Sequence, residues 1–243
     1  MPQPVRVVGM SLAVVLSIGC ASPYSAYYHD FLDGKSVDQV PSLVPHDGEP
    51  QVYSARDFET DRRALTEDGY ILIGYSSFNA TIADPRDAIS HARRIGAAIV
   101  LLESRHASTE RGATSYALQN LPGGYTIHHV PYSIDRYDFG ATFWAKAKST
   151  ILGIAATDLS ADDRIGLSRN RGAVVDVVIK RSPAFDADIM RGDVITKFNG
   201  ELLTDASELS EMTRRHAGKE VVLEIFRDGR PQEVKLRLNP AAY

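Results

Sequence analysis

The chain has 243 residues, of which 44% are hydrophobic and 24% are charged, and its formal net charge is −4. That length accommodates one large domain or two small ones, and a balance so close to neutral gives no electrostatic reason to expect nucleic acid as a partner. The single cysteine, Cys20, excludes an internal disulfide and a cysteine-rich zinc site.

Residues 1–20 have the pattern of an export signal. One arginine precedes an apolar run at 7–18, which is too short to span a bilayer comfortably, and Gly-Cys follows at once. The pattern resembles the bacterial lipoprotein signal, which implies cleavage before Cys20, acylation of that residue and, from Ala21, sorting to the outer membrane. Two alternatives stay open: a simple secretory signal cleaved after Ala21 or Ala26, and a retained membrane anchor.

The segment 21–50 is rich in Pro, Ser, Asp and Gly and has no sustained hydrophobic period. Such a composition buries little apolar surface, so we expect a linker or irregular arm.

A first folded unit is expected at 51–146. Charged residues with helical spacing are followed by a compact apolar strand, and Asp84-Pro85 then begins a helix that Gly96 ends. A strand buried on both faces, a polar stretch and a further strand follow. These elements are expected at residues 56–67, 70–75, 85–95, 97–102, 104–115 and 125–132. Their order predicts a small α/β domain of unknown role.

The second unit, at 147–240, has a more specific pattern. Short strands alternate with turns at Asn199-Gly200 and Asp228-Gly229, and a helix begins at Asp205. The string SPAFDADIMRGDVITKFNG, at 182–200, resembles the PDZ domains attached to periplasmic HtrA-type proteases. The resemblance implies a partly open β-barrel with two helices, so the fold class expected for the whole chain is α+β.

The resemblance also implies a peptide-binding groove. In such domains an extended C-terminal peptide adds a strand to a sheet edge, and its carboxylate sits in a nest of backbone N–H groups. The loop at 151–154 matches the family's carboxylate-binding loop. Gly153 is expected to adopt a positive φ, which a β-branched residue does not readily adopt, and a side chain there is expected to crowd the ligand. Lys146 and Lys148, just upstream, are expected to supply a positive field.

The helix after Asp205 is expected to form the other wall. By helical spacing, Leu209, Met212 and His216 share the face expected toward the core, which leaves a second, small set for the groove. The predicted peptide-binding residues are therefore Ile151, Leu152, Gly153, Ile154, Ala155, Ala156, Ala206, Ser210 and Thr213.

The sequence shows no recognisable catalytic machinery. No serine has the glycine-framed setting of a nucleophile, so the histidines at 91, 106, 128 and 129 have no evident catalytic partner. His128 and His129 are neighbours on a predicted strand and point to opposite faces, so they cannot both bind one ion. We expect one of them to face the core and form a hydrogen bond, and we predict neither a metal nor another cofactor.

The leading hypothesis is a non-catalytic adaptor of the cell envelope, lipid-anchored or periplasmic, which binds C-terminal or extended peptide segments of partner proteins. One alternative is a packing module whose groove is filled by its own chain. Another is an enzyme of unseen chemistry at 51–146, with the PDZ unit recruiting substrate. A deep pocket with converging His, Asp and Ser in the first unit would favour the enzyme.

Overall fold

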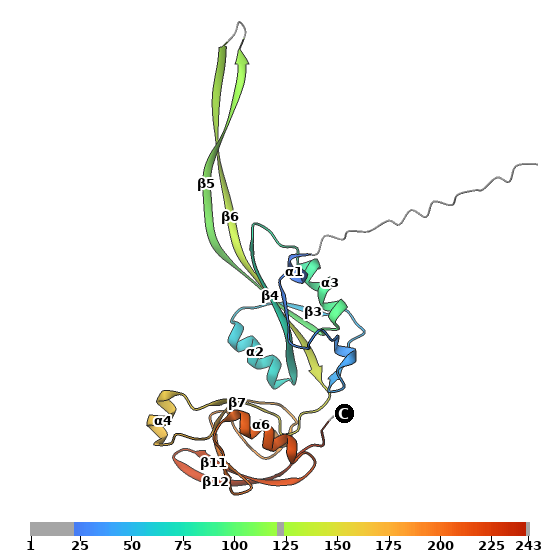
Figure 1. The fold of residues 1–243 in the computed structure, drawn as a ribbon, viewed down its shortest axis with the longest axis vertical. Helices are drawn as coiled ribbons and strands as arrows, with labels where there is room; N and C mark the ends of the chain where they lie inside the picture. The colour runs from blue at the N-terminus through green and yellow to red at the C-terminus, as the bar shows by residue number, and fades with distance from the viewer. Residues whose placement is uncertain (1–21, 121–123, 242–243) are drawn as a thin grey trace, which may run out of the picture.

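The computed structural model describes residues 22–120 and 124–241, which form two sheets of six strands each (Figure 1). Cys20 and the predicted signal lie outside the described residues. Within the described ranges, no helix is both long enough and apolar enough to cross a membrane.

The first sheet is mostly antiparallel, with a parallel strand at one edge. Its order is β1 (Tyr28–Asp30), β4 (Tyr70–Ala80), β6 (Gly124–Ala147), β5 (Ile99–Asn120) and β3 (Gln51–Ser54), and β2 (Leu43–Val44) pairs with the end of β6. Only β3 runs parallel to its neighbour β5 among these described strands.

Helices cover both faces of this sheet. On one face, α3 (Pro85–Ile95) and α1 (Pro23–Ala26) pack against a core that includes Phe143. On the other face, α2 (Phe58–Glu67) places Leu65 against Trp144, the next residue along β6. Successive strand residues point to opposite faces, so Phe143 belongs to the core on one face of the sheet and Trp144 to the core on the other.

The expectation of a linker at 21–50 is wrong for its described part. Tyr24 and Val37 are buried in the core of the first unit, and β1 pairs with β4. Ser76 Oγ donates a hydrogen bond of 2.5 Å to the Tyr24 carbonyl. These apolar residues are spaced singly, so they show no local period; each fills a place prepared by strands that lie far away in the sequence.

A long hairpin projects from the first sheet. Strands β5 and β6 contain 22 and 24 residues, and the pairing of β6 with β4 ends at Ala80 and Tyr137. Beyond that point, the described part of β5 and β6 pairs only with itself, as far as Asn120 and Gly124 (Figure 1). The sequence indicated a polar stretch and a separate strand here, and the continuous hairpin was not foreseen.

The second sheet is open, with β12 and β7 at its ends. Its order is β12 (Arg230–Arg237), β11 (Glu220–Arg227), β9 (Val194–Phe198), β8 (Ala173–Val178) and β7 (Ile154–Asp158), with β10 (Glu201–Leu202) on β9. Three helices accompany it: α4 (Ala161–Leu167), α5 (Pro183–Asp186) and α6 (Ala206–Arg215). The α+β class is confirmed.

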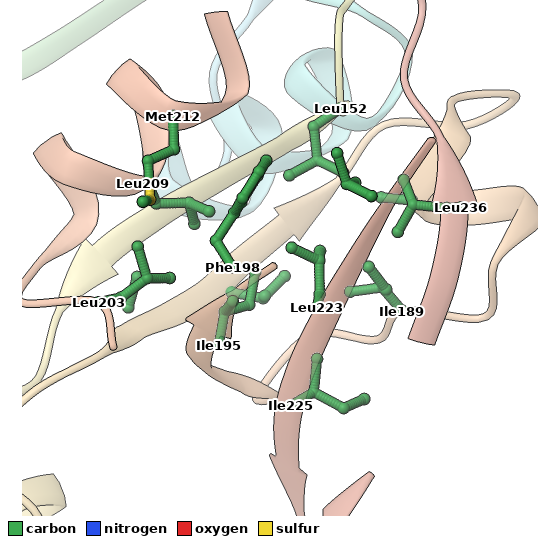
Figure 2. Close-up of a cluster of buried hydrophobic side chains, with 14 of the residues drawn as sticks. Leu152, Ile189, Ile195, Phe198, Leu203, Leu209, Met212, Leu223, Ile225 and Leu236 are labelled. Atoms are coloured by element: carbon green, nitrogen blue, oxygen red, sulfur yellow. The ribbon is translucent and has the colours of Figure 1, made fainter. Parts of the chain in front are cut away.

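The core of the second unit holds α6 against the sheet. Figure 2 shows Leu209 and Met212 of α6 directed toward Phe198, which is fully buried. Burial of each such side chain contributes about 1.5–3 kcal/mol. Asp205 caps the helix, because its carboxylate accepts the Glu208 N–H at 2.9 Å. The groove wall on the outer side of α6 therefore has a fixed position.

The turn between α2 and β4 contacts the second unit. The Lys180 N–H donates to the Glu67 carbonyl at 2.8 Å, and Lys180 Nζ donates to Asp68 Oδ1 at 2.7 Å. Arg62 of α2 also lies 3.7 Å from the carboxylate of Asp176 on β8. The end of β8 is thereby attached to the first unit.

Candidate peptide-binding groove

A groove lies between β7, an end strand of the second sheet, and α6. It encloses about 290 Å³ and opens to the surface. Its lining residues are Thr150, Ile151, Leu152, Gly153, Ile154, Ala156, Ile179, Leu209, Ser210, Thr213 and Arg214.

The loop at 150–153 directs its carbonyl groups into the domain. The carbonyls of Leu152 and Gly153 accept N–H groups of Ala184 and Ile179 at 2.9 and 2.8 Å. Asn239 binds the two preceding carbonyls, with its backbone N–H at 2.9 Å and its side-chain amide also at 2.9 Å. Within the described ranges, the N–H groups of Leu152 and Gly153 have no acceptor. Adjacent unpaired amides of this kind form a nest for an anion.

Position 153 requires glycine because of the way the loop packs against the rest of the second unit. Its φ is +87°, and a Cβ added there would lie 2.0 Å from the Cβ of Ser182. Ser182 is buried and begins α5, where its Oγ accepts the Phe185 N–H at 3.2 Å. The positive φ expected at Gly153 is confirmed, and a side chain there would also strike Ser182, a contact that the sequence did not indicate.

The helix wall is partly as expected. Ser210 and Thr213 line the groove, but Ala206 does not: it packs beside the core, and its N–H donates to Asp158 Oδ1 at 2.9 Å. Leu209 contributes to both core and groove. Arg214 was missed, although its spacing of four from Ser210 is the signal that places both on one helix face.

Along β7, which forms the strand wall of the groove, successive side chains alternate in direction. Ile154 and Ala156 of β7 line the groove, whereas the predicted Ala155 between them is not part of the lining. Neighbouring strand side chains point to opposite faces, so Ala155 contributes backbone alone to this edge.

Thr213 carries a polar atom into the wall. The side chain is 8% exposed, and its Oγ1 is buried without a hydrogen-bond partner among the described residues. A buried hydroxyl without a partner costs about 1–3 kcal/mol, so a ligand group that bonds to it would recover part of that cost.

The two upstream lysines have different surroundings. Lys146 Nζ donates to the Asp68 carbonyl and lies 4.6 Å from the centre of the Tyr70 ring, so it is bound to the first unit. The Lys148 side chain is exposed, although its backbone N–H donates to Ser42. Of the two, Lys148 is the one able to act on a ligand.

The histidines of the hairpin do not face a core. His128 stacks on Tyr116 with ring centres 5.4 Å apart, and His129 Nδ1 lies 2.7 Å from Ser115 Oγ. Both histidines are exposed, so the expectation that one would face the core is wrong. The hairpin has solvent on both faces here, and a strand position alone does not bury a side chain.

One exposed trio on the hairpin has the composition of a catalytic triad. Thr109 Oγ1 donates to Asp135 Oδ1 at 2.7 Å, and His106 Nε2 lies 3.0 Å from the same hydroxyl. That hydrogen bond from Thr109 lowers the pKa of the Asp135 carboxyl. The hydroxyl proton is directed to the carboxylate, so the histidine does not activate Thr109 as a nucleophile.

The first unit has an apolar hollow of about 400 Å³ between α2 and the sheet. Phe31, Phe58 and Tyr75 line it together with Glu103 and Thr142, and its described lining contains neither histidine nor aspartate. Across the described ranges, no group of three or more His, Cys, Asp or Glu residues is arranged to hold a metal ion.

Comparison with known proteins relates the second unit to one family. Residues 150–238 match the family model described as the PDZ domain. The periplasmic pH-dependent serine endoprotease DegQ of Escherichia coli K12 is 32% identical over 158 residues, which are 55% of this chain and 34% of DegQ. A probable periplasmic serine protease, do/HhoA-like, of Haemophilus influenzae is 33% identical over 98 residues, which are 39% and 21% of the two chains.

The chain thus spans about a third or less of the length of these curated relatives. Among solved structures, the HtrA3 PDZ domain bound to a phage-derived ligand is 26% identical, with a TM-score of 0.33. That match covers 36% of this chain and 83% of the HtrA3 chain.

Proposed function

Because residues 150–238 form a PDZ domain, we propose that this chain is a non-catalytic binding protein of the bacterial cell envelope, which takes C-terminal or extended peptide segments into the groove between β7 and α6. The observation that carries the proposal is the loop at 150–153. Its four carbonyls are bound inside the domain, and among the described residues the amides of Leu152 and Gly153 have no acceptor, which leaves them for a carboxylate.

The ligand adds to β7 as an antiparallel strand, so main-chain hydrogen bonds supply affinity and the side-chain hollow supplies specificity. The final side chain of the peptide enters the space between Leu152, Leu209 and Thr213. Its carboxylate accepts the two free amides, and hydrogen bonds to an ionised group are the stronger kind. We expect micromolar affinity, which corresponds to about 8 kcal/mol.

Peptides with free and amidated C-termini test this function by fluorescence polarisation with the full chain. Amidation removes the charge that the nest holds, so we expect a loss of affinity of about tenfold. Ser210→Tyr places a large ring in the groove from an exposed position of α6 and should abolish binding. Ser207→Tyr, exposed on the same helix but outside the lining, is the matched control. Binding that ignores both amidation and Ser210→Tyr contradicts the proposal and favours the packing module.

The adaptor is preferred to an enzyme because of the first unit's hollow. Its described lining includes Ser76 and Ser77 but neither histidine nor aspartate, so these serines lack the partners that a hydrolytic chemistry would need there. If substitution of the exposed Thr109 and Asp135 leaves the function of the chain intact, the result supports the adaptor. If the substitution removes that function and a catalytic activity with it, the result supports the enzyme.

The envelope location is proposed from the relatives, which are described as periplasmic. We also propose that Cys20 is acylated. A cut after Ala26 would remove α1 with its buried Tyr24, so the structure of that helix supports a signal that ends earlier. Metabolic labelling with a lipid analogue should mark the native chain and leave Cys20→Ser unlabelled; equal labelling of the two would overturn the proposal.

A further inference from the structure

A second cavity adjoins the groove at the loop that presents the free amides. It encloses about 720 Å³ and is built from both units. Its walls are the turn at 68–70, the connection at 146–150, the turn at 179–181, and Phe185 and Asn239. Thr150 and Ile179 line both hollows, so the groove and this cavity are neighbours.

The cavity is basic, although the chain as a whole has a net charge of −4. Four cations line it, Lys146, Lys148, Lys180 and Arg181, against one carboxylate, that of Asp68, which leaves an excess of three positive charges.

The four cations of the cavity differ in whether they already have a partner. Lys180 forms an ion pair with Asp68, which raises the pKa of the lysine, and Lys146 is bound to the backbone of the same residue. Lys148 and Arg181 are exposed and form no ion pair within the described ranges. A smaller hollow beside Arg181 is lined by Lys235 and Arg237 and by one carboxylate, that of Asp186. Within the larger cavity, Lys148 and Arg181 are therefore the cations available to a ligand.

The direction of the groove decides which part of a ligand meets these cations. β7 begins at Ile154, beside the loop, and runs away from the cavity to Asp158. A peptide strand that adds antiparallel to β7 runs the other way, so its C-terminal end arrives at the loop and faces the basic cavity.

We propose, on the basis of the peptide-binding function above, that this cavity holds the acidic end of the ligand, and that the preferred partners are proteins whose C-termini carry additional Asp or Glu side chains. The loop amides accommodate one carboxylate. Lys148 and Arg181 accommodate the further carboxylates that a single nest cannot hold. The cavity therefore selects among C-termini by charge, while the groove selects by the shape of the side chains.

The test uses the full chain and two peptide pools with the same randomised upstream positions. One pool ends in Asp-Asp-Leu and the other in Asn-Asn-Leu, so the common last side chain enters the groove and the two residues before it differ in charge but hardly in shape. Two exposed ion pairs support a preference of about fivefold for the acidic pool, and added salt should reduce it.

The variants remove the cations without altering the groove. Lys148→Gln combined with Arg181→Asn should abolish the preference; Asn is chosen because Arg181 has a φ of +59°, which Asn tolerates well. Arg164→Gln, on the distant helix α4, should retain it.

Equal affinity for both pools in the native chain, or a preference that survives the double substitution, overturns the inference but leaves peptide binding intact. Failure of both pools to bind, with free or amidated ends, overturns the inference and the proposed function together.

Discussion

Arg227 holds the buried carboxylate of Asp193 with two parallel hydrogen bonds. Its Nε lies 2.7 Å from Oδ1 and its Nη2 lies 2.6 Å from Oδ2, while the Asp193 side chain is only 2% exposed. The carboxylate also accepts the Met190 N–H at 2.8 Å, and it raises the pKa of the Arg227 guanidinium. The pair thereby fastens the loop before β9 to the end of β11.

Arg227→Leu should destabilise the second unit strongly. Removal of one partner leaves a buried carboxylate without its counter-charge, which costs about 3–5 kcal/mol in free energy of unfolding. Arg227→Lys keeps the charge but loses the two-pronged geometry, so its loss should be smaller. Urea unfolding measures both, and Arg230→Leu, exposed on the same hairpin, is the control. Equal stability of the Arg227→Leu and Arg230→Leu variants would contradict this role.

The stability of the first unit should depend on pH through His91. The side chain is 5% exposed and packs between the rings of Tyr28 and Phe143 at 4.4 and 5.1 Å. Burial and the neighbouring Arg94 guanidinium lower the pKa of His91 from 6.5 to about 4. The unfolded chain therefore takes up this proton at a higher pH than the folded chain.

It follows that the stability contributed by neutral His91 is complete above pH 6.5 and is lost as the pH falls toward about 4. The loss over that window is about 3 kcal/mol. His91→Phe, which keeps an aromatic ring, should flatten this part of the stability profile, whereas His106→Gln on the exposed hairpin should not. Thermal unfolding monitored at successive pH values decides the matter; a profile that His91→Phe leaves unchanged would refute the assignment.

Gly153→Ala should destabilise the second unit, and the size of the loss should depend on Ser182. The added Cβ meets the Cβ of Ser182, and the positive φ adds backbone strain. We expect a loss of stability of about 3 kcal/mol or more. Ser182→Gly removes the opposing atom at the cost of the α5 cap, so the double variant should be more stable than the sum of the two single losses predicts. Strict additivity in denaturant unfolding would show that the two residues do not interact.

Thr213→Val should stabilise the second unit by about 1 kcal/mol, because it replaces a buried hydroxyl that has no partner within the described ranges with a methyl group of similar shape. In a peptide-binding assay, the same change should disfavour ligands whose last side chain is polar. Unchanged or lower stability in calorimetry would mean that the hydroxyl is satisfied in solution.

The second unit was predictable because its signals are local. Asn199-Gly200 and Asp228-Gly229 mark turns in the sequence itself, and both lie between paired strands as expected. The cap at Asp205 is equally local. The partner of Asp193 was not predictable, because Arg227 lies 34 residues away and nothing in the intervening sequence links the two.

The first unit shows why the remaining predictions failed. Tyr24 and Val37 are single apolar residues whose burial depends on strands that come later in the chain. The hairpin lacks the alternation of a half-buried strand, because from Ser108 to Tyr116 nearly every described side chain is exposed. In the groove, the direction of Gly153 toward Ser182 depends on a contact across 29 residues.

The hairpin also sets how far this chain can reach. From His106 to Asn120, β5 pairs only with β6 in the described part, and a strand of that extent spans roughly 50 Å at about 3.3 Å per residue. In Figure 1 it points away from the second unit, which carries the groove. A peptide held beside β7 and a protein that touches Tyr116 at the outer part of the hairpin would therefore not collide. One copy of the chain is thus long enough to hold two partners at once, as a spacer between them.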